Sequence, residues 1–269
     1  MPRGRYLSGV PAATPERSTS LDAAAHAVLE LTAPNRLEED LVGLDDALTA
    51  RGLEPRPTLL RQVVRGRAPV EGAGLVAGRL PFIRAALHRN GLAMPEPLDY
   101  LDVPVTALGR AIWPSTLGAV AARLEHRGEP VFIKPRGVAK RFTGRVVDQP
   151  IDLRALPVSS PATPVWCSEV IEIVSEYRVF LRHGEILGIQ HYDGDPGKAP
   201  ALGGVRAVVD EVREHLPAGC ALDVGVLAPD RVVLIEANDG FSLGRYGLDA
   251  DPYVDVLHAR WTELVSPGR

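Results

Sequence analysis

The sequence predicts a protein of mixed helices and strands, in the α/β and α+β classes. Strand and helix patterns alternate in the first third of the chain, which favours a small α/β layer. Short strands joined by turns follow in the middle, and a strongly alternating pair of strands precedes a last amphipathic helix. Together these patterns predict a short α/β domain followed by a larger part rich in antiparallel strands.

In the first part, one helix is predicted over 35–52. Leucines recur there at helical spacing, and Asn35 with Glu38 forms a capping box. A strand at 74–78 leads into a helix over 80–89, which ends at an Asn-Gly pair. These elements complete the expected α/β layer.

Two prolines, Pro95 and Pro97, interrupt this pattern and predict a boundary between an N-terminal domain and the rest of the chain. A helix that ends near Glu125 and an apolar strand at 130–134 come next, followed by a polar loop. The turn-linked strands of the middle section then predict an antiparallel sheet. A C-terminal helix, capped by an Asp-Pro pair, is expected to pack back on this sheet.

The composition restricts the classes of partner. The 269 residues carry a net charge of −4, with 45% hydrophobic and 24% charged residues, so no bulk attraction to nucleic acid or anionic membrane is expected. The chain shows neither a signal-peptide pattern nor an apolar run of about 18 residues. Its only cysteines, Cys167 and Cys220, lack zinc-site spacing and are expected to be buried thiols. We therefore expect a cytoplasmic protein that binds no nucleic acid and no membrane, and whether it forms a homodimer stays open.

Two alternating segments around a Pro-Asp turn predict a β-hairpin late in the chain. If the loop holds an even number of residues, Leu227 pairs with Val232, and Asp223 then lies opposite Glu236 with Cβ atoms about 5 Å apart. Because side chains alternate along a strand, Asn238 points to the same side as Glu236. The hairpin therefore gathers three oxygen-bearing side chains on one face.

Opposed carboxylates repel each other unless a cation lies between them. Two carboxylates and an amide are hard oxygen ligands that suit Mg²⁺, so Asp223, Glu236 and Asn238 are candidate metal ligands. The alternative is a structural network, in which Arg231, Arg245 or a distant lysine neutralises the two acids.

Lys134 ends an apolar strand, and the loop that follows adds Arg136, Lys140, Arg141 and two glycines. A cation at a strand end, followed by a basic loop, suits the binding of phosphate groups. The P-loop pattern GxxxxGK[ST] does not occur in the chain. The alternative for the loop is a surface hairpin whose basic residues are solvated.

Three acids, Glu169, Glu172 and Glu176, interrupt otherwise apolar strand sequence. Ribose hydroxyls could donate to Glu176, and the backbone between the other two could present an amide and a carbonyl to the edge of adenine. The alternative is an exposed ion pair, such as one between Glu176 and Arg178, which contributes little energy and indicates no function.

The order of the segments FIKP, SEVIE, EYRVF and DVGV…LIEAND resembles the ATP-grasp superfamily, over about 96–269. The resemblance implies two α+β subdomains that grip ATP, with a lid-like subdomain at about 115–168. The piece over 1–95 would be the short α/β domain that precedes the grasp. The implied cofactors are ATP and Mg²⁺.

The resemblance also implies roles for single residues. Lys134 would contact the α and β phosphates, with Arg136 and Lys140 in the loop that closes over them. The nucleoside would be bound by Glu169 near the adenine amino group, by the backbone at Val170 and Glu172, and by Glu176 at the ribose. Asp223, Glu236 and Asn238 would be the Mg²⁺ ligands.

The chain departs from the family pattern at two cations. Ala221 stands where many members carry an arginine, so Arg178 or Arg245 is expected to steady the transferred phosphoryl group. Arg110 is the nearest cation that could replace a lysine that often precedes the lid. Lys140, Arg178 and Arg245 are therefore the candidate catalytic residues.

The activity that the resemblance implies is a carboxylate–amine ligase that works through an acyl phosphate, with an amino acid or peptide among the acid and amine substrates. Ser242 and Arg245 are the main candidates for substrate contacts, and His191 and Tyr192 are weaker ones. The alternatives are a small-molecule kinase on the same scaffold and a non-catalytic nucleotide-binding module. The sequence does not identify the acid or the amine.

Overall fold

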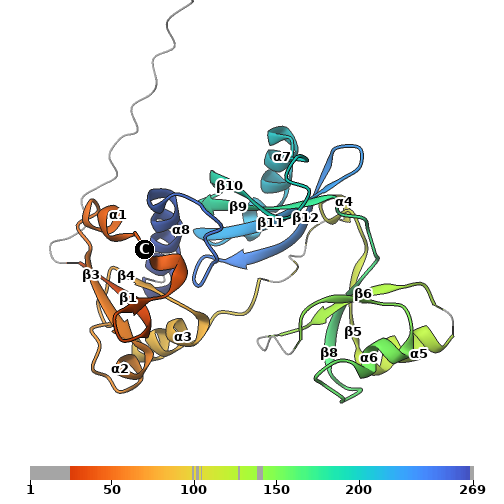
Figure 1. Ribbon diagram of the computed structural model, residues 1–269, viewed down its shortest axis with the longest axis horizontal. Helices are drawn as coiled ribbons and strands as arrows, with labels where there is room; N and C mark the ends of the chain where they lie inside the picture. Colours follow the sequence, from red (N-terminus) through yellow and green to blue (C-terminus); the bar gives the residue numbers. More distant parts are fainter. Residues whose placement is uncertain are drawn as a thin grey trace, which may run out of the picture.

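The computed structural model describes residues 25–266, except 99, 101, 102, 104, 127 and 138–141. In this part the strands form three four-stranded sheets (Figure 1). We call them the N-terminal sheet (β1 to β4), the small sheet (β5 to β8) and the central sheet (β9 to β12). The predicted mixture of helices and several sheets is confirmed.

In the N-terminal sheet, β1 pairs in parallel with β3 and β4 and antiparallel with β2. Parallel neighbours need crossover connections, and short helices supply them here. The strands are β1 (His26–Ala33), β2 (Arg36–Leu37), β3 (Glu54–Leu59) and β4 (Leu75–Ala77), and the helices are η1 (Glu39–Leu41), α1 (Asp45–Thr49), α2 (Leu60–Val64) and α3 (Leu80–Arg89). The strand predicted at 74–78 and the helix predicted over 80–89 are confirmed as β4 and α3.

The single helix predicted over 35–52 is wrong. The segment contains β2, the 3₁₀ turn η1 and the short helix α1 instead. Asn35 and Gly43 have positive φ values of 60° and 75°, so the backbone turns at both positions and cannot continue as a helix. The leucines at 41, 44 and 48 are all buried, although they belong to separate short elements. Their spacing reflected burial in the core, and not one continuous helix.

The small sheet is antiparallel throughout, in the order β5-β8-β6-β7. Helices α5 and α6 pack together beside it over an apolar core. Thr116 caps α5 through a hydrogen bond from the backbone N of Ala119. The elements are β5 (Ile112–Thr116), α5 (Leu117–Glu125), β6 (Val131–Pro135), β7 (Arg145–Val147), α6 (Pro150–Arg154) and β8 (Pro164–Ser168).

The central sheet is also antiparallel, in the order β10-β9-β11-β12. Helices α4 and α7 pack on one face of it, on β12. On the other face, α8 packs against β9 and β11. The elements are α4 (Val105–Leu108), β9 (Ser175–Arg182), β10 (Glu185–Gly194), α7 (Leu202–Val212), η2 (Arg213–His215), β11 (Gly219–Leu227), β12 (Arg231–Asp239) and α8 (Ala250–Val265).

The C-terminal helix α8 joins the central sheet to the N-terminal sheet, between which it lies in Figure 1. Phe180 and Ala221 of the central sheet share one buried core with α8 and with the N-terminal elements. Trp261 of α8 donates its indole N–H to the carbonyl of Ala73 at 2.9 Å. Two of the three sheets are thus held by a common core, whereas the small sheet has its own. Among the described residues, no helix is both long and apolar enough to cross a membrane.

Candidate active site

The hairpin of β11 and β12 has a different loop from the predicted one. Leu227 pairs with the residue before Val232, so the loop has an odd number of residues and the predicted Leu227–Val232 pair is wrong. A β-bulge at Ile235 then shifts the register by one residue. As a result, Asp223 lies directly opposite Glu236, as predicted.

Arg178 of β9 neutralises Asp223. Its Nε and Nη2 each donate to a carboxylate oxygen of Asp223 at 2.8 Å, and the amide of Asn238 donates to the same carboxylate at 3.0 Å. Both charged side chains are buried, so the bidentate geometry offsets part of the cost of removing them from water. The structural network that named Arg231 or Arg245 as the neutralising cation is therefore wrong about the residue, because Arg178 fills that place.

Lys134, at the end of β6, connects the small sheet to the central sheet. Its Nζ lies 3.0 Å from Oε2 of Glu236 and 4.0 Å from the ring centroid of Tyr100. Nearby in the small sheet, Cζ of Arg136 lies 4.8 Å from the ring centroid of Trp166, a residue of β8. The lysine that was expected to bind phosphates thus contacts an acid that was expected to bind metal.

The segment from Glu169 to Val174 links the small sheet to the central sheet, between β8 and β9. Glu169 is tied to Ala111: its backbone N donates to the Ala111 carbonyl at 3.1 Å, and its carboxylate accepts from the Ala111 N at 2.9 Å. Val170 and Glu172 are exposed. The three residues expected at the adenine therefore lie together on the link between the sheets, and their roles stay predictions.

Glu176 faces the same side of β9 as Arg178, and it lies beside other acids. Burial raises the pKa of Glu176 above its ordinary value, and the charges of Asp193, Asp223 and Glu236 raise it further. Within the described part of the chain, Glu176 forms no ion pair. The alternative pair with Arg178 is not formed, because Arg178 binds Asp223.

Aromatic side chains surround Arg178, and no pattern in the sequence marked them as a group. Cζ of Arg178 lies 4.8 Å from the ring centroid of Tyr246 and 5.6 Å from that of Tyr192. The two tyrosine rings meet edge to face, with centroids 5.0 Å apart. His191, a weaker substrate candidate, packs instead against Tyr177, with ring centroids 5.2 Å apart.

Arg110, expected to supply an extra cation, is buried and binds the backbone of β12. Its Nη1 donates to the carbonyl of Leu234 and its Nη2 to that of Ile235, both at 3.0 Å. The side chain therefore contacts the bulge itself. No feature of the sequence around Arg110 predicted this contact.

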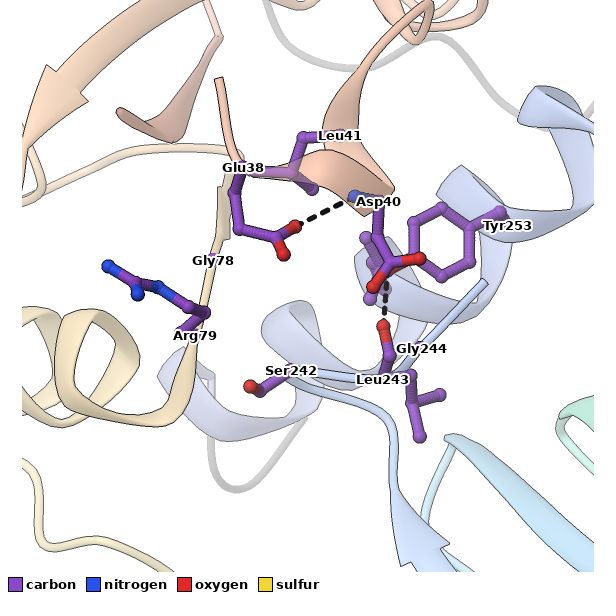
Figure 2. A pocket seen from close by; sticks show the side chains of 10 residues that line it. Glu38, Asp40, Leu41, Gly78, Arg79, Ser242, Leu243, Gly244 and Tyr253 are labelled. Carbon is purple, nitrogen blue, oxygen red and sulfur yellow. Dashed lines mark hydrogen bonds between the residues drawn. The ribbon is translucent and has the colours of Figure 1, made fainter. Parts of the chain in front are cut away.

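Ser242 lines a cavity of about 120 Å³ between the loop after β12 and the N-terminal sheet. Figure 2 shows Ser242 on one side of this cavity and the carboxylates of Glu38 and Asp40 on the other. Burial raises the pKa of Glu38, and the nearby charge of Asp40 raises it further. The cavity therefore combines a hydroxyl and two acids from distant parts of the chain.

Arg245 lies beside this cavity, and none of its hydrogen bonds to described residues reaches the Asp223–Glu236 pair. Its backbone N donates to the carboxylate of Asp40 at 2.8 Å, and its guanidinium donates to the carbonyls of Val42 and Leu248. Its charge thus holds the loop after β12 against the N-terminal part. Lys140 lies outside the described residues.

The donor set of the acidic pair fits a hard cation. The described residues contain no group of three or more His, Cys, Asp or Glu side chains that could hold a metal ion. The available oxygens are those of Asp223, Glu236 and the amide of Asn238, which leave the rest of an octahedral shell to water and phosphate, as Mg²⁺ prefers. Glu236 is one-third exposed and shares only Oε2 with Lys134 among the described contacts, so it can also face a ligand.

Comparison with known proteins identifies the family. A family model of the ATP-grasp domain, described as family 2 of its clade, matches residues 108–256, which is more than half of the chain. The chain belongs to the ATP-grasp superfamily. No curated protein matches the sequence.

Solved structures of low sequence identity show the same fold. A RimK-domain ATP-grasp protein from Sphaerobacter thermophilus has a TM-score of 0.51 at 20% identity, over 87% of this chain and 99% of that one. The N5-carboxyaminoimidazole synthetase of Staphylococcus aureus has a TM-score of 0.57 at 9% identity, over 90% and 79%. The D-alanine–D-alanine ligase of Bacillus anthracis, solved with ATP, has a TM-score of 0.55 at 10% identity, over 90% and 98%. The predicted superfamily and fold are confirmed.

Proposed function

We propose that this ATP-grasp protein is an ADP-forming ligase that joins a carboxylic acid to an amine through an acyl phosphate. The observation that carries the proposal is the meeting of two sheets at one place. Lys134 of the small sheet contacts Glu236, and Glu236 lies opposite Asp223 on the central sheet. A cation suited to phosphates and a donor set suited to Mg²⁺ therefore come together where a nucleotide would have to lie.

The family and the similar structures support this reading. The structural neighbours named above include a ligase and a synthetase, and the Bacillus anthracis ligase was solved with ATP. We therefore propose ATP and Mg²⁺ as the cofactors of this chain. We also propose an N-terminal domain over 1–95, an ATP-grasp domain over 96–269 with a lid-like part at about 115–168, and a cytoplasmic location.

The nucleoside end of ATP would lie along the link between the small and central sheets. In the proposal, the backbone at Val170 and Glu172 binds the edge of adenine, and Glu169 lies near its amino group. Glu176 accepts hydrogen bonds from the ribose hydroxyls. The raised pKa of Glu176 supports a ligand there, because a half-buried acid without an ion pair gains from hydroxyl donors.

The phosphates would lie between the sheets. Lys134 and Arg136 bind them from the small sheet, and Lys140 belongs to the loop that closes over them. Asp223, Glu236 and Asn238 hold the metal, which supplies charge neutralisation between the phosphate groups and the acid. Of the candidate cations, Arg178 is best placed to act at the transferred phosphoryl group, since it already fixes the orientation of Asp223.

The reaction needs little covalent chemistry from the protein. A carboxylate oxygen of the acid attacks the γ-phosphorus, the bond from that phosphorus to ADP breaks, and an acyl phosphate forms. The amine then attacks the carbonyl carbon, phosphate leaves, and the nitrogen loses a proton. Such transfers depend on positioning and charge stabilisation, in agreement with a candidate site built from cations, acids and amides.

We place part of the substrate in the cavity between Ser242 and the acids Glu38 and Asp40. Its charge pattern favours a substrate with a polar or cationic group, and its size favours a small group such as the end of an amino acid or peptide. Arg245 would act indirectly, by holding the loop that carries Ser242.

ADP release measured with paired pools of acids and amines tests the proposal. We expect ADP only when an acid and an amine are both present, with an amide as the product in mass spectrometry. Glu236→Gln should abolish this release, whereas the control Glu185→Gln, at an exposed acid of β10 far along the strand from the site, should leave it unchanged. ADP release without an amine, together with a durable phosphoester, would identify a kinase instead. Absence of ATP binding at millimolar concentration would reject both enzymatic readings.

A further inference from the structure

The bulge in β12 decides which face of the central sheet carries Glu236. Leu234 faces the core beneath α7, where it lies opposite Val224. Without the extra residue Ile235, the ladder would continue in the same register and Glu236 would lie opposite Leu222, which is fully buried in that core. A shift of one residue turns every later side chain to the other face. The bulge therefore moves Glu236 out of the core side and places it opposite Asp223.

A bulge interrupts the ladder of backbone hydrogen bonds, so the groups around it need other partners. Arg110 supplies them: it donates to the carbonyls of Leu234 and Ile235, which flank the register shift, and also to its own neighbour Leu108 at 2.9 Å. The side chain is only 5% exposed. Among the described contacts it has no acidic partner in an ion pair, so its donors serve the backbone.

The residue before Arg110 allows this close approach. Gly109 has a φ of 66°, a conformation that disfavours larger residues, and a Cβ at this position would lie 2.5 Å from Cγ1 of Val233. Any side chain here would push the segment away from β12. Gly109 and Arg110 together thus form a clamp on the strand, reached from the end of α4.

We propose that Arg110 is a positioning residue: it holds the β12 bulge and thereby the register that brings Glu236 to Asp223. Arg110 acts through the strand and does not contact the nucleotide. The clamp is a feature of the protein alone, and only its consequence for Mg²⁺ rests on the proposed function.

The test compares Arg110→Met with Arg231→Met. Arg231 is a matched control, because its Nη2 also ties β12 to α4, through the carbonyl of Thr106 at 3.1 Å, but at the hairpin end and away from the bulge. Amide hydrogen exchange reports the clamp directly. We expect exchange at Ile235 and Glu236 to rise about tenfold in Arg110→Met, the scale of one lost charged hydrogen bond, and to stay unchanged in Arg231→Met.

ATP affinity with and without Mg²⁺ reports the consequence. In Arg110→Met the gain in affinity that Mg²⁺ provides should fall about tenfold, while the affinity without Mg²⁺ stays within about twofold of the wild type. Should Arg110→Met fail to fold, Arg110→Lys keeps the charge but cannot reach both carbonyls at once, and a partial rise in exchange is expected.

Equal losses of ATP affinity with and without Mg²⁺ would overturn the proposal, since they would mean that Arg110 binds the nucleotide itself. Unchanged exchange at the bulge in both Arg110 variants would also overturn it. If the wild type binds no Mg-ATP, the proposed function fails, yet the exchange measurement still decides whether Arg110 holds the bulge.

Discussion

The ion pair between Lys134 and Glu236 predicts an unusual response to the substitution Glu236→Gln. In the structure, Glu236 holds the ammonium group that the phosphates of ATP would need. Replacing the acid by its amide releases Lys134 and removes a negative charge near the phosphates. We therefore expect Glu236→Gln to bind ATP more tightly than the wild type when Mg²⁺ is left out, and to lose most of the gain that Mg²⁺ provides.

The contact sets the magnitude. Nζ and Oε2 are 3.0 Å apart, and the side chains of Lys134 and Glu236 are 12% and 34% exposed. Water screens a pair of this kind, so it contributes about 1 kcal/mol, which corresponds to about fivefold in a binding constant. The affinity for ATP without Mg²⁺ should thus rise about fivefold in Glu236→Gln.

Isothermal titration calorimetry with ATP, in EDTA and in Mg²⁺, measures this effect on a double-mutant cycle with Lys134→Met. In the Lys134→Met background, Glu236→Gln should give no more than the small gain from the lost charge repulsion. If Glu236→Gln weakens ATP binding without Mg²⁺, or strengthens it equally in both backgrounds, the ion pair does not compete with the nucleotide and the reasoning is refuted.

Three further predictions concern stability. Arg178→Met should lower the free energy of unfolding by about 3–5 kcal/mol in urea titrations, because it leaves Asp223 buried without its cation, and a loss below about 1 kcal/mol would contradict the buried pair. Gly219→Ala should destabilise strongly, since a Cβ there would collide with the carbonyl oxygen of Val256 in α8, whereas Gly203→Ala meets nothing within 4 Å and serves as the control in thermal melts. Burial raises the pKa of Glu176, so the folded protein holds this proton more tightly than the unfolded chain and is destabilised by ionisation as the pH rises above the usual glutamate value; Glu176→Gln should therefore raise the melting temperature at pH 7 and change little at pH 4, and equal effects at both pH values would argue against the shift.

Much of the second half of the fold was predictable because its strands alternate. Period-2 patterns record half-buried strands, and those at β11 and β12 were clear. The segment over 35–52 was not predictable in the same way. Buried leucines at helical spacing came from short elements that Asn35 and Gly43 separate by positive φ, and spacing alone records burial without continuity.

The acidic pair was predicted for a partly wrong reason. An even loop without a bulge and an odd loop with one bulge give the same parity, so Asp223 meets Glu236 in either case. The bulge depends on Arg110, which is 124 residues from Leu234 in the sequence, and no local pattern contains a contact of that range. The same holds for Arg178, whose choice of Asp223 over Glu176 is set by the pairing of β9 with β11.

The partner of Arg245 illustrates a similar limit. Its charge was expected near the phosphoryl group, but the chain turns after β12 and places it beside Asp40 of the N-terminal part. That neighbour belongs to a segment more than 200 residues earlier. Roles for single cations in a loop therefore depend on the packing of distant segments, whereas the presence of a strand pair does not.

A crystal structure with Mg²⁺ and a non-hydrolysable ATP analogue tests the central claim most directly. We predict a metal ion about 2.1 Å from oxygens of Glu236 and Asn238, with Asp223 alongside and the ammonium group of Lys134 moved from Glu236 to the phosphates. A nucleotide bound elsewhere, with the contact between Lys134 and Glu236 intact, would contradict the account.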